Sequence, residues 1–294
     1  MSANPKTWLE AARPKTLPAA VMPVMVGTAL AAAHNATNFA RAAICLIFAL
    51  LVQIGTNFAN DYYDFVQGAD TAARVGPRRA VAAGLVTPRQ MLIATWLVLG
   101  VAFAVGLLLV HECGWVLLPI GVISIVCAIA YTGGPFPLGY NGLGDLFVFL
   151  FFGLVAVCTT FYVQVGHVTL DVVYCAAAIG VLAANILVAN NYRDAETDAL
   201  AGKKTLVVRF GRTFALWQYA LSYAFALLCP LILFLMGGYR WLILLPVVLT
   251  PAAISLTRKL GASREPAERI ALLGATALYL ALYGVLLSLG LAVR

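Results

Sequence analysis

Long apolar runs separated by short polar stretches follow one another along most of the chain. The runs are continuous rather than alternating, which favours membrane-spanning helices over the strands of a closed barrel. Most of them approach the roughly 20 residues that a helix needs to cross a bilayer. The pattern therefore predicts nine transmembrane helices, at Leu17–Ala33, Ala42–Asn60, Gln90–Val110, Trp115–Tyr131, Leu146–Val165, Val172–Asn190, Thr213–Met236, Trp241–Leu256 and Ile270–Val293.

Composition agrees with a chain that lies in lipid. Of the 294 residues, 63% are hydrophobic and 11% are charged, and the mean hydropathy is +0.94. These values lie well outside the range of soluble globular domains. The predicted fold class is an all-α polytopic membrane protein.

The basic residues gather on one side of the predicted helices. Sixteen of the nineteen Lys and Arg fall in the amino-terminal stretch or in the loops after the second, fourth, sixth and eighth helices. Because cytoplasmic loops carry the excess of Lys and Arg, we expect these segments in the cytoplasm and the carboxyl terminus outside. The net charge of +7 thus indicates the topology of an inner-membrane protein, with the lipid bilayer as a partner, rather than nucleic-acid binding.

Two polar clusters close the second and the sixth predicted helix, at 57–70 and 190–198. In each cluster an Asn precedes an Asp by four residues, Asn60 before Asp64 and Asn190 before Asp194, with Asp198 one turn further on. Residues four apart share one face of a helix, so each set directs oxygen atoms the same way. Gly68 offers a place where the chain can turn and bring Asp70 back toward the first set.

Carboxylate and amide oxygens suit a hard cation such as Mg²⁺, which keeps several waters and is completed by substrate phosphate oxygens. A single such cluster at a helix end is more often a solvated terminus. Two clusters at the same membrane depth favour a site with two Mg²⁺ ions around one diphosphate. The candidate metal ligands are Asn60, Asp61, Asp64, Asp70, Asn190, Asp194 and Asp198.

Cations follow both clusters, and carboxylates, magnesium and basic side chains together make a phosphate site. The alternative is that these cations only set the topology and reach out to lipid headgroups. The residues predicted to bind diphosphate are Lys15, Arg74, Arg79, Lys203 and Arg209, and the cations predicted to be catalytic are Lys15, Arg79, Lys203 and Lys204.

At these residues the sequence resembles the UbiA superfamily of intramembrane aromatic prenyltransferases, which carries two Asp-rich motifs after the second and the sixth of nine helices. The longer patterns around Asn60–Thr71 and Asn190–Leu206 resemble the branch that prenylates 1,4-dihydroxy-2-naphthoate in menaquinone biosynthesis. Further matches are Arg13–Leu17, Arg79–Val81 with Gly84–Val86, Tyr131–Thr132 and Gly142–Asp145. One departure is that Gly133–Gly144 contains no basic residue, although related enzymes often have one there.

The resemblance implies a single domain over residues 1–294, with nine helices around a central cavity and motifs at about 57–71 and 190–206. It implies that a polyprenyl group passes from polyprenyl diphosphate to the aromatic acid, with loss of diphosphate and CO₂, to give demethylmenaquinone. The allylic cation would lie near aromatic faces, and the nearest candidates by position are Tyr62, Tyr63, Tyr131 and Tyr192. Of these, the resemblance implies that Tyr131 is a catalytic residue.

Other functions stay open at this stage. A different aromatic acceptor, such as 4-hydroxybenzoate or haem, fits the same class, although the Gly68-x-Asp70 arrangement argues against it. A secondary transporter would place its charges near mid-bilayer, whereas here they lie at one end of the helices. The prenyl chain length and the oligomeric state are not specified by the pattern.

Overall fold

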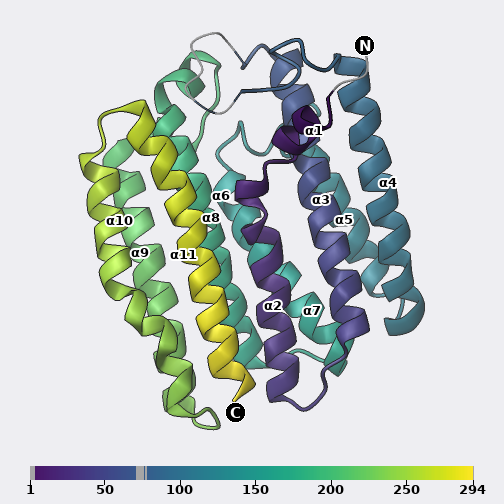
Figure 1. Cartoon of the computed structure of the whole chain (residues 1–294), viewed down its shortest axis with the longest axis vertical. Coiled ribbons are helices and arrows are strands. Elements are labelled where there is room, and N and C mark those ends of the chain that lie inside the picture. The colour runs from purple at the N-terminus through teal and green to yellow at the C-terminus, as the bar shows by residue number, and fades with distance from the viewer. Residues whose placement is uncertain (1–3, 71–75, 77, 294) are drawn as a thin grey trace.

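The computed structural model describes residues 4–70, 76 and 78–293, and every regular element in this part of the chain is a helix. The helices form one bundle, with the two ends of the chain at opposite ends of it (Figure 1). Arg74 lies outside the described residues. In chain order the elements are α1 (Pro5–Ala12), η1 (Pro14–Thr16), α2 (Pro18–Ala33), α3 (Phe39–Val66), α4 (Pro88–Cys113), α5 (Leu117–Ala130), α6 (Gly144–Val148), η2 (Phe149–Val155), α7 (Ala156–Val165), α8 (Leu170–Leu200), α9 (Leu206–Met236), η3 (Trp241–Leu249), α10 (Thr250–Ala262) and α11 (Pro266–Ala292).

Among the described residues, seven helical segments are long and apolar enough to cross a membrane, or eight if α1–η1 and α2 form one span bent by 53°. The predicted Trp115–Tyr131 span becomes the shorter α5, of 14 residues. The predicted all-α membrane fold is confirmed, and each of the nine predicted segments overlaps a helix. The count of nine spans is not confirmed, because α5 falls below the length of a full crossing.

Local sequence explains where several helices begin and bend. Thr87 and Gln90 form a reciprocal cap at the start of α4, and Asn38 accepts a hydrogen bond from the Arg41 N–H at the start of α3. Gly211 has a φ of 82°, which breaks the helical course of α9. Glycine adopts this left-handed conformation without steric cost.

Helix α8 is the most enclosed span, with 72% of its apolar window buried, and it packs against α9, α11 and η2. Its crossing with η2 is close because two glycines meet there. A Cβ atom at Gly153 would lie 2.6 Å from the Ala176 carbonyl oxygen and from the Gly180 Cα. The second polar cluster is thus carried on a helix that is fixed from several sides.

Element η2 is a π-helix inside the continuous helical segment Gly144–Val165. π-Helical turns change the direction in which side chains project and are found often at functional sites. Here Phe147, Phe151 and Phe152 all line the central cavity.

Candidate active site

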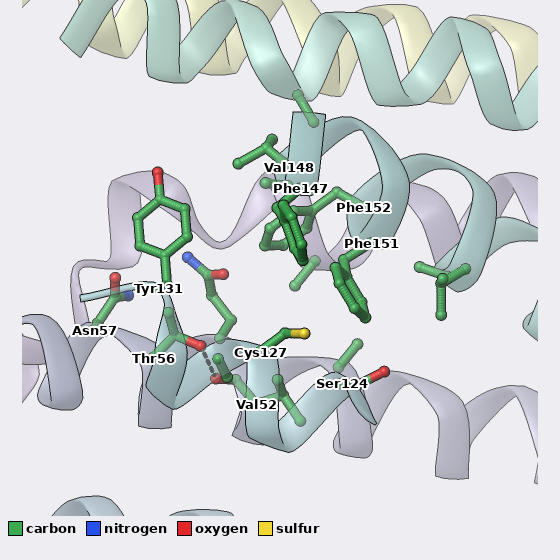
Figure 2. Close-up of a pocket in the computed structure, with 18 of the residues that line it drawn as sticks. Val52, Thr56, Asn57, Ser124, Cys127, Tyr131, Phe147, Val148, Phe151 and Phe152 are labelled. Atoms are coloured by element: carbon green, nitrogen blue, oxygen red, sulfur yellow. Dashed lines mark hydrogen bonds between the residues drawn. The ribbon is translucent and has the colours of Figure 1, made fainter. Parts of the chain in front are cut away.

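A cavity of about 340 Å³ lies inside the bundle between α2, α3, α5, η2 and α8. Its volume falls in the range of pockets that hold small molecules, about 300–1,000 Å³. Figure 2 shows Tyr131, Asn57 and Thr56 at one part of its wall and the rings of Phe147 and Phe151 at another. The cavity therefore joins a polar region to an apolar one.

Asp64 is contacted by three other side chains at the polar end of the cavity. It accepts hydrogen bonds from Arg79 Nη2 at 2.7 Å, from the Tyr140 hydroxyl at 2.7 Å and from Lys203 Nζ at 3.1 Å. These partners come from the loop after α3, from the loop after α5 and from the turn after α8. Asp64 therefore ties three distant segments to one point.

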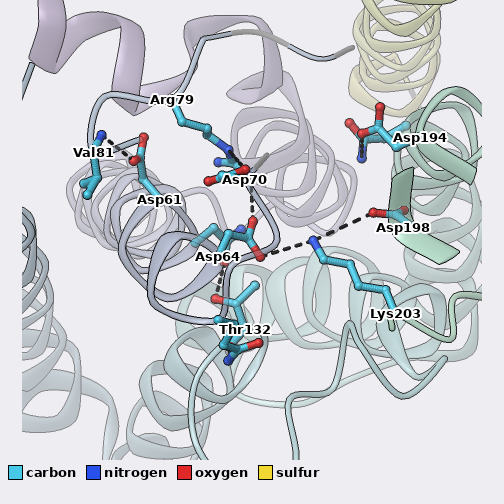
Figure 3. Close-up of polar contacts among 12 residues, drawn as sticks. Asp61, Asp64, Asp70, Arg79, Val81, Thr132, Asp194, Asp198 and Lys203 are labelled. Carbon is cyan, nitrogen blue, oxygen red and sulfur yellow. Dashed lines mark hydrogen bonds and ion pairs between the residues drawn. The ribbon is translucent and has the colours of Figure 1, made fainter. Parts of the chain in front are cut away.

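The two polar clusters face each other across this point (Figure 3). Lys203 Nζ lies 3.1 Å from Asp64 Oδ1 and 3.8 Å from Asp198 Oδ1. One cation thus bridges a carboxylate of each cluster. Residues of both clusters line the same cavity, namely Asn60, Asp64, Asn190, Asp194 and Asp198.

The second cluster is organised by Arg193, whose side chain is fully buried. Its guanidinium donates to both oxygens of Asp194, at 2.7 and 2.6 Å, and to Asn190 Oδ1 at 2.8 Å. Bidentate pairs of this kind fix geometry as well as charge. Asp194 and Asn190 are therefore held on one face of α8.

Asp61 and Asp70 have different surroundings. The two oxygens of Asp61 accept the backbone N–H groups of Ala80 and Val81, at 3.0 and 2.9 Å, and the residue is absent from the cavity wall. Asp70 follows the left-handed Gly68, and its Oδ1 lies 3.5 Å from Arg79 Nε. Arg79 thus contacts both Asp64 and Asp70, whereas Asp61 holds the loop that carries Arg79.

Three of the predicted cations do not reach the cavity wall. Lys15 and Lys204 are exposed, and the exposed Arg209 donates to the Asn141 carbonyl at 2.9 Å. The backbone N–H of Lys204 donates to the Tyr140 carbonyl at 2.7 Å, which joins the loop after α5 to the turn after α8. Of the predicted cations with described positions, Arg79 and Lys203 line the cavity.

The four tyrosines predicted to lie near the allylic cation occupy different positions relative to the cavity. Tyr131 lines the cavity, whereas the ring of Tyr192 faces the guanidinium groups of Arg212 and Arg269, at 5.1 and 5.9 Å. Tyr62 and Tyr63 pack edge to face with ring centroids 5.0 Å apart and do not line the cavity. Tyr131 alone of this set faces the substrate space in the described structure.

Sequence reasoning missed Arg13 and Tyr140. Arg13 lines the cavity from the bend between α1 and α2, where its φ is 54°, while its neighbour Lys15 points elsewhere. Tyr140 lies in Gly133–Gly144, the segment without a basic residue, and donates its hydroxyl to Asp64. Burial and the nearby Asp64 raise the pKa of Tyr140, so its phenol stays a protonated donor at neutral pH.

The carboxylate and amide oxygens of the two clusters suit magnesium that is bound together with waters and a substrate. In the described part of the chain, no three Asp, Glu, His or Cys side chains converge as a ready-made metal site. Carboxylate and amide oxygens instead line opposite sides of the polar end of the cavity. Mg²⁺ is often held by one or two carboxylates with waters and substrate phosphates, and this arrangement suits such ions better than an all-protein cage.

Comparison with known proteins defines the class. The model of the UbiA prenyltransferase family matches residues 20–283, and the chain belongs to that family. The resemblance expected from the motifs is confirmed, and the protein is an aromatic prenyltransferase of the intramembrane type, a family in which magnesium dependence is typical.

Two relatives of this chain share one name, and a solved structure shares its fold. The chain is 34% identical to a 1,4-dihydroxy-2-naphthoate octaprenyltransferase of Haemophilus influenzae, over 98% of this chain and 96% of that one. It is 45% identical to the protein of the same name from Mycobacterium tuberculosis, over 74% of this chain and 75% of that one. A solved UbiA homologue from Archaeoglobus fulgidus, bound to GPP and Mg²⁺, shares the fold with a TM-score of 0.66 at 18% identity, over 96% of this chain and 99% of that one.

Proposed function

We propose that this protein transfers a polyprenyl group from polyprenyl diphosphate to 1,4-dihydroxy-2-naphthoate, with release of diphosphate and CO₂. The product is demethylmenaquinone, formed first as its quinol. The observation that carries the proposal is the meeting of two Asp clusters at the polar end of a largely apolar cavity, bridged by Lys203. The names of the relatives from two different bacteria support the choice of acceptor.

The polar end binds the diphosphate in this proposal. Asp64, Asp194 and Asp198, with the amide oxygens of Asn60 and Asn190, would hold two Mg²⁺ ions beside the diphosphate. Bound magnesium supplies positive charge next to the leaving group. Asp70 steadies Arg79 against the first cluster.

Arg79 and Lys203 stabilise the charge that grows on the diphosphate as the allylic C–O bond breaks and the electron pair leaves with oxygen. Both are already desolvated beside Asp64. Oriented cations in a water-poor site stabilise developing charge more strongly than they would in water. Their effect is therefore greatest in the transition state.

The apolar walls protect the allylic cation. Tyr131 and the rings of Phe147, Phe151 and Phe152 line the cavity below the diphosphate end, and aromatic faces attract cations. The electron-rich naphthoate ring attacks with the carbon that bears the carboxylate. A C–C bond forms, CO₂ leaves, and the electrons of the broken bond restore the aromatic ring.

The membrane orientation completes the proposal. One domain spans the whole chain in the cytoplasmic membrane, with the polar end of the cavity toward the cytoplasm and the carboxyl terminus outside. Arg13, close to the amino terminus, lines the cavity, and the two chain ends lie at opposite ends of the bundle (Figure 1). Water-soluble diphosphate then departs on the side where it is metabolised.

An acceptor panel tests the proposal. The purified protein is incubated with Mg²⁺, octaprenyl diphosphate and either 1,4-dihydroxy-2-naphthoate, 4-hydroxybenzoate or haem, and prenylated products are identified by mass spectrometry. We expect product with the naphthoate alone. Efficient prenylation of 4-hydroxybenzoate or haem without prenylation of the naphthoate would overturn the choice of acceptor.

A further inference from the structure

A cluster of two arginines and one tyrosine joins α8, α9 and α11 outside the central cavity. The buried ring of Tyr192 on α8 has the guanidinium carbon of Arg212, on α9, 5.1 Å from its centroid and that of Arg269, on α11, 5.9 Å away. None of these three residues lines the cavity. The cluster is therefore separate from the proposed diphosphate site.

The cluster carries more positive charge than its surroundings balance. Arg212 Nη2 donates to Glu196 at 2.8 Å, but the Glu196 side chain is 64% exposed, so water weakens this pair. Arg269 Nη2 donates to the Ser263 carbonyl at 3.3 Å, and it forms no ion pair with any described carboxylate. The neighbouring Glu268 instead accepts backbone N–H groups of the loop before α11. Two guanidinium groups thus share one screened carboxylate.

Hydrogen-bond donors in the cluster also outnumber acceptors. The Nε atoms of Arg212 and Arg269 are both buried, and neither has a hydrogen-bond acceptor within the described part of the chain. Buried donors are nearly always paired, and an unpaired charged donor is costly. Both side chains as a whole are half-buried, so an anion can approach their other nitrogen atoms from outside. The cluster therefore has the charge and the donors for an anionic acceptor that the chain does not supply.

The cluster lies where a charged end of the bundle meets the apolar outer surface. The rings of Phe210 and Phe214 flank Arg212 in the sequence of α9, with centroids 5.0 Å apart, and both are exposed. Ile270, next to Arg269 on α11, is exposed as well. Figure 1 shows α9, α10 and α11 together on one side of the bundle. Cations beside exposed apolar side chains at helix ends indicate the level of phospholipid headgroups.

We propose that Arg212 and Arg269 bind the phosphate group of an anionic phospholipid beside the ring of Tyr192. Guanidinium groups match phosphate oxygens through paired, charge-assisted hydrogen bonds, and basic pockets between membrane helices bind anionic headgroups. A lipid fits better than a soluble anion, because the exposed apolar side chains next to the cluster can pack against acyl chains. The bound lipid would join α9 and α11 to the end of α8, the helix that carries Asp194 and Asp198.

Lipid titration of the full-length protein in detergent tests the proposal without using enzyme activity. Native mass spectrometry measures the dissociation constants of bound phosphatidylglycerol and of phosphatidylcholine with the same acyl chains. We expect the unchanged protein to bind one phosphatidylglycerol about tenfold or more tightly than phosphatidylcholine. Arg212→Gln and Arg269→Gln should each remove most of this preference, because each variant loses a charge-assisted contact to the phosphate. An unchanged protein without any preference would overturn the site.

Two further variants separate this cluster from overall charge. Arg258→Gln is the matched control, because Arg258 is an exposed cation on α10 and takes no part in the cluster. It should keep the preference for phosphatidylglycerol. Arg269→Lys keeps the charge without the planar guanidinium group, so its affinity should lie between those of the unchanged protein and Arg269→Gln. An equal loss of preference in Arg258→Gln and in the cluster variants would overturn the proposal.

Thermal unfolding gives a second readout and checks that the variants fold. Phosphatidylglycerol should raise the melting temperature of the unchanged protein and of Arg258→Gln, but not of the cluster variants, because a ligand of the native state stabilises it. If Arg212→Gln does not fold, Arg269→Gln decides the test, since its side chain donates to a single carbonyl. Inorganic phosphate or diphosphate that gives the same arginine-dependent stabilisation in place of lipid would overturn the choice of a phospholipid.

Discussion

Asp64 is a buried carboxylate with two cations and one phenol as partners, drawn from three loops. Desolvation of a charge is costly, and here it is offset by opposite charges at hydrogen-bond distance. The same contacts keep Arg79 and Lys203 beside the position proposed for the diphosphate. Stability of the site and charge stabilisation during the reaction therefore depend on the same residues.

Replacement of these cations should affect turnover more than binding. We expect Arg79→Gln and Lys203→Gln each to lower kcat by about 100-fold or more, because their interaction strengthens as charge develops on the leaving group. Steady-state kinetics with saturating donor measure this. Arg258→Gln, at an exposed site on α10, is the control and should keep normal turnover. The reverse order of effects would remove both cations from the diphosphate site.

Replacement of Asp198 should lower turnover, whereas replacement of Asp61 should lower stability. Asp198→Asn removes a proposed magnesium ligand, and we expect kcat to fall about 100-fold with little change in thermal stability. Asp61→Asn disturbs the acceptors for two buried N–H groups, so it should lower the free energy of unfolding by about 1–3 kcal/mol. Thermal unfolding and magnesium titration of activity separate the two. A changed magnesium requirement with unchanged stability in Asp61→Asn would restore Asp61 as a ligand.

The spacing of residues along the chain predicts the part of the site that lies on a regular helix. It does not predict the part that depends on loops and turns. The four-residue interval carried Asn190, Asp194 and Asp198 to one cavity wall, because α8 stays helical to Leu200. Asp61 belongs to the first cluster, but it accepts hydrogen bonds from the loop at Ala80 and does not line the cavity. Arg13 and Lys15 are two residues apart, and a left-handed turn at Arg13 decides which one faces the cavity. Such turns leave no periodic signal.

At the scale of elements, the close crossing of η2 and α8 holds the helix with the aromatic wall against the helix that carries the second cluster. The Phe149 carbonyl oxygen would lie 2.7 Å from a Cβ atom at Gly180. The run Phe149–Val155 is continuously apolar, so its sequence predicts an ordinary helix and hides the π-helical turn. Likewise, the apolar run around α5 is long enough to predict a full span, although the helix has only 14 residues.

Gly180→Ala should therefore weaken the bundle. The added methyl group forces η2 away from α8, and overpacking of this kind costs about 1–3 kcal/mol. We expect a lower melting temperature in detergent and reduced activity. Gly274→Ala is the matched control, since Gly274 also lies in a membrane helix but has nothing within 4 Å of an added Cβ atom. Equal melting temperatures for the two variants would contradict the close crossing.

The whole molecule separates a polar end from an apolar interior, and the basic residues are predicted to mark the cytoplasmic side. A reporter that is active only in the cytoplasm should be active when fused after Gly76 or Lys204. The same reporter should be silent after His111, in the last turn of α4, or after His167, which follows α7. Activity at His111 with silence at Lys204 would invert the proposed orientation and move the diphosphate site to the outer face.

The fate of the acceptor's carboxyl carbon is the most direct test of a decarboxylating prenyl transfer. Purified protein is given Mg²⁺, octaprenyl diphosphate and 1,4-dihydroxy-2-naphthoate labelled with ¹³C in the carboxyl group. We predict labelled CO₂, diphosphate and unlabelled octaprenyl demethylmenaquinone in equal amounts, with all three lost on removal of magnesium. Diphosphate release without a prenylated naphthoquinone, or a prenylated product that keeps the label, would contradict it.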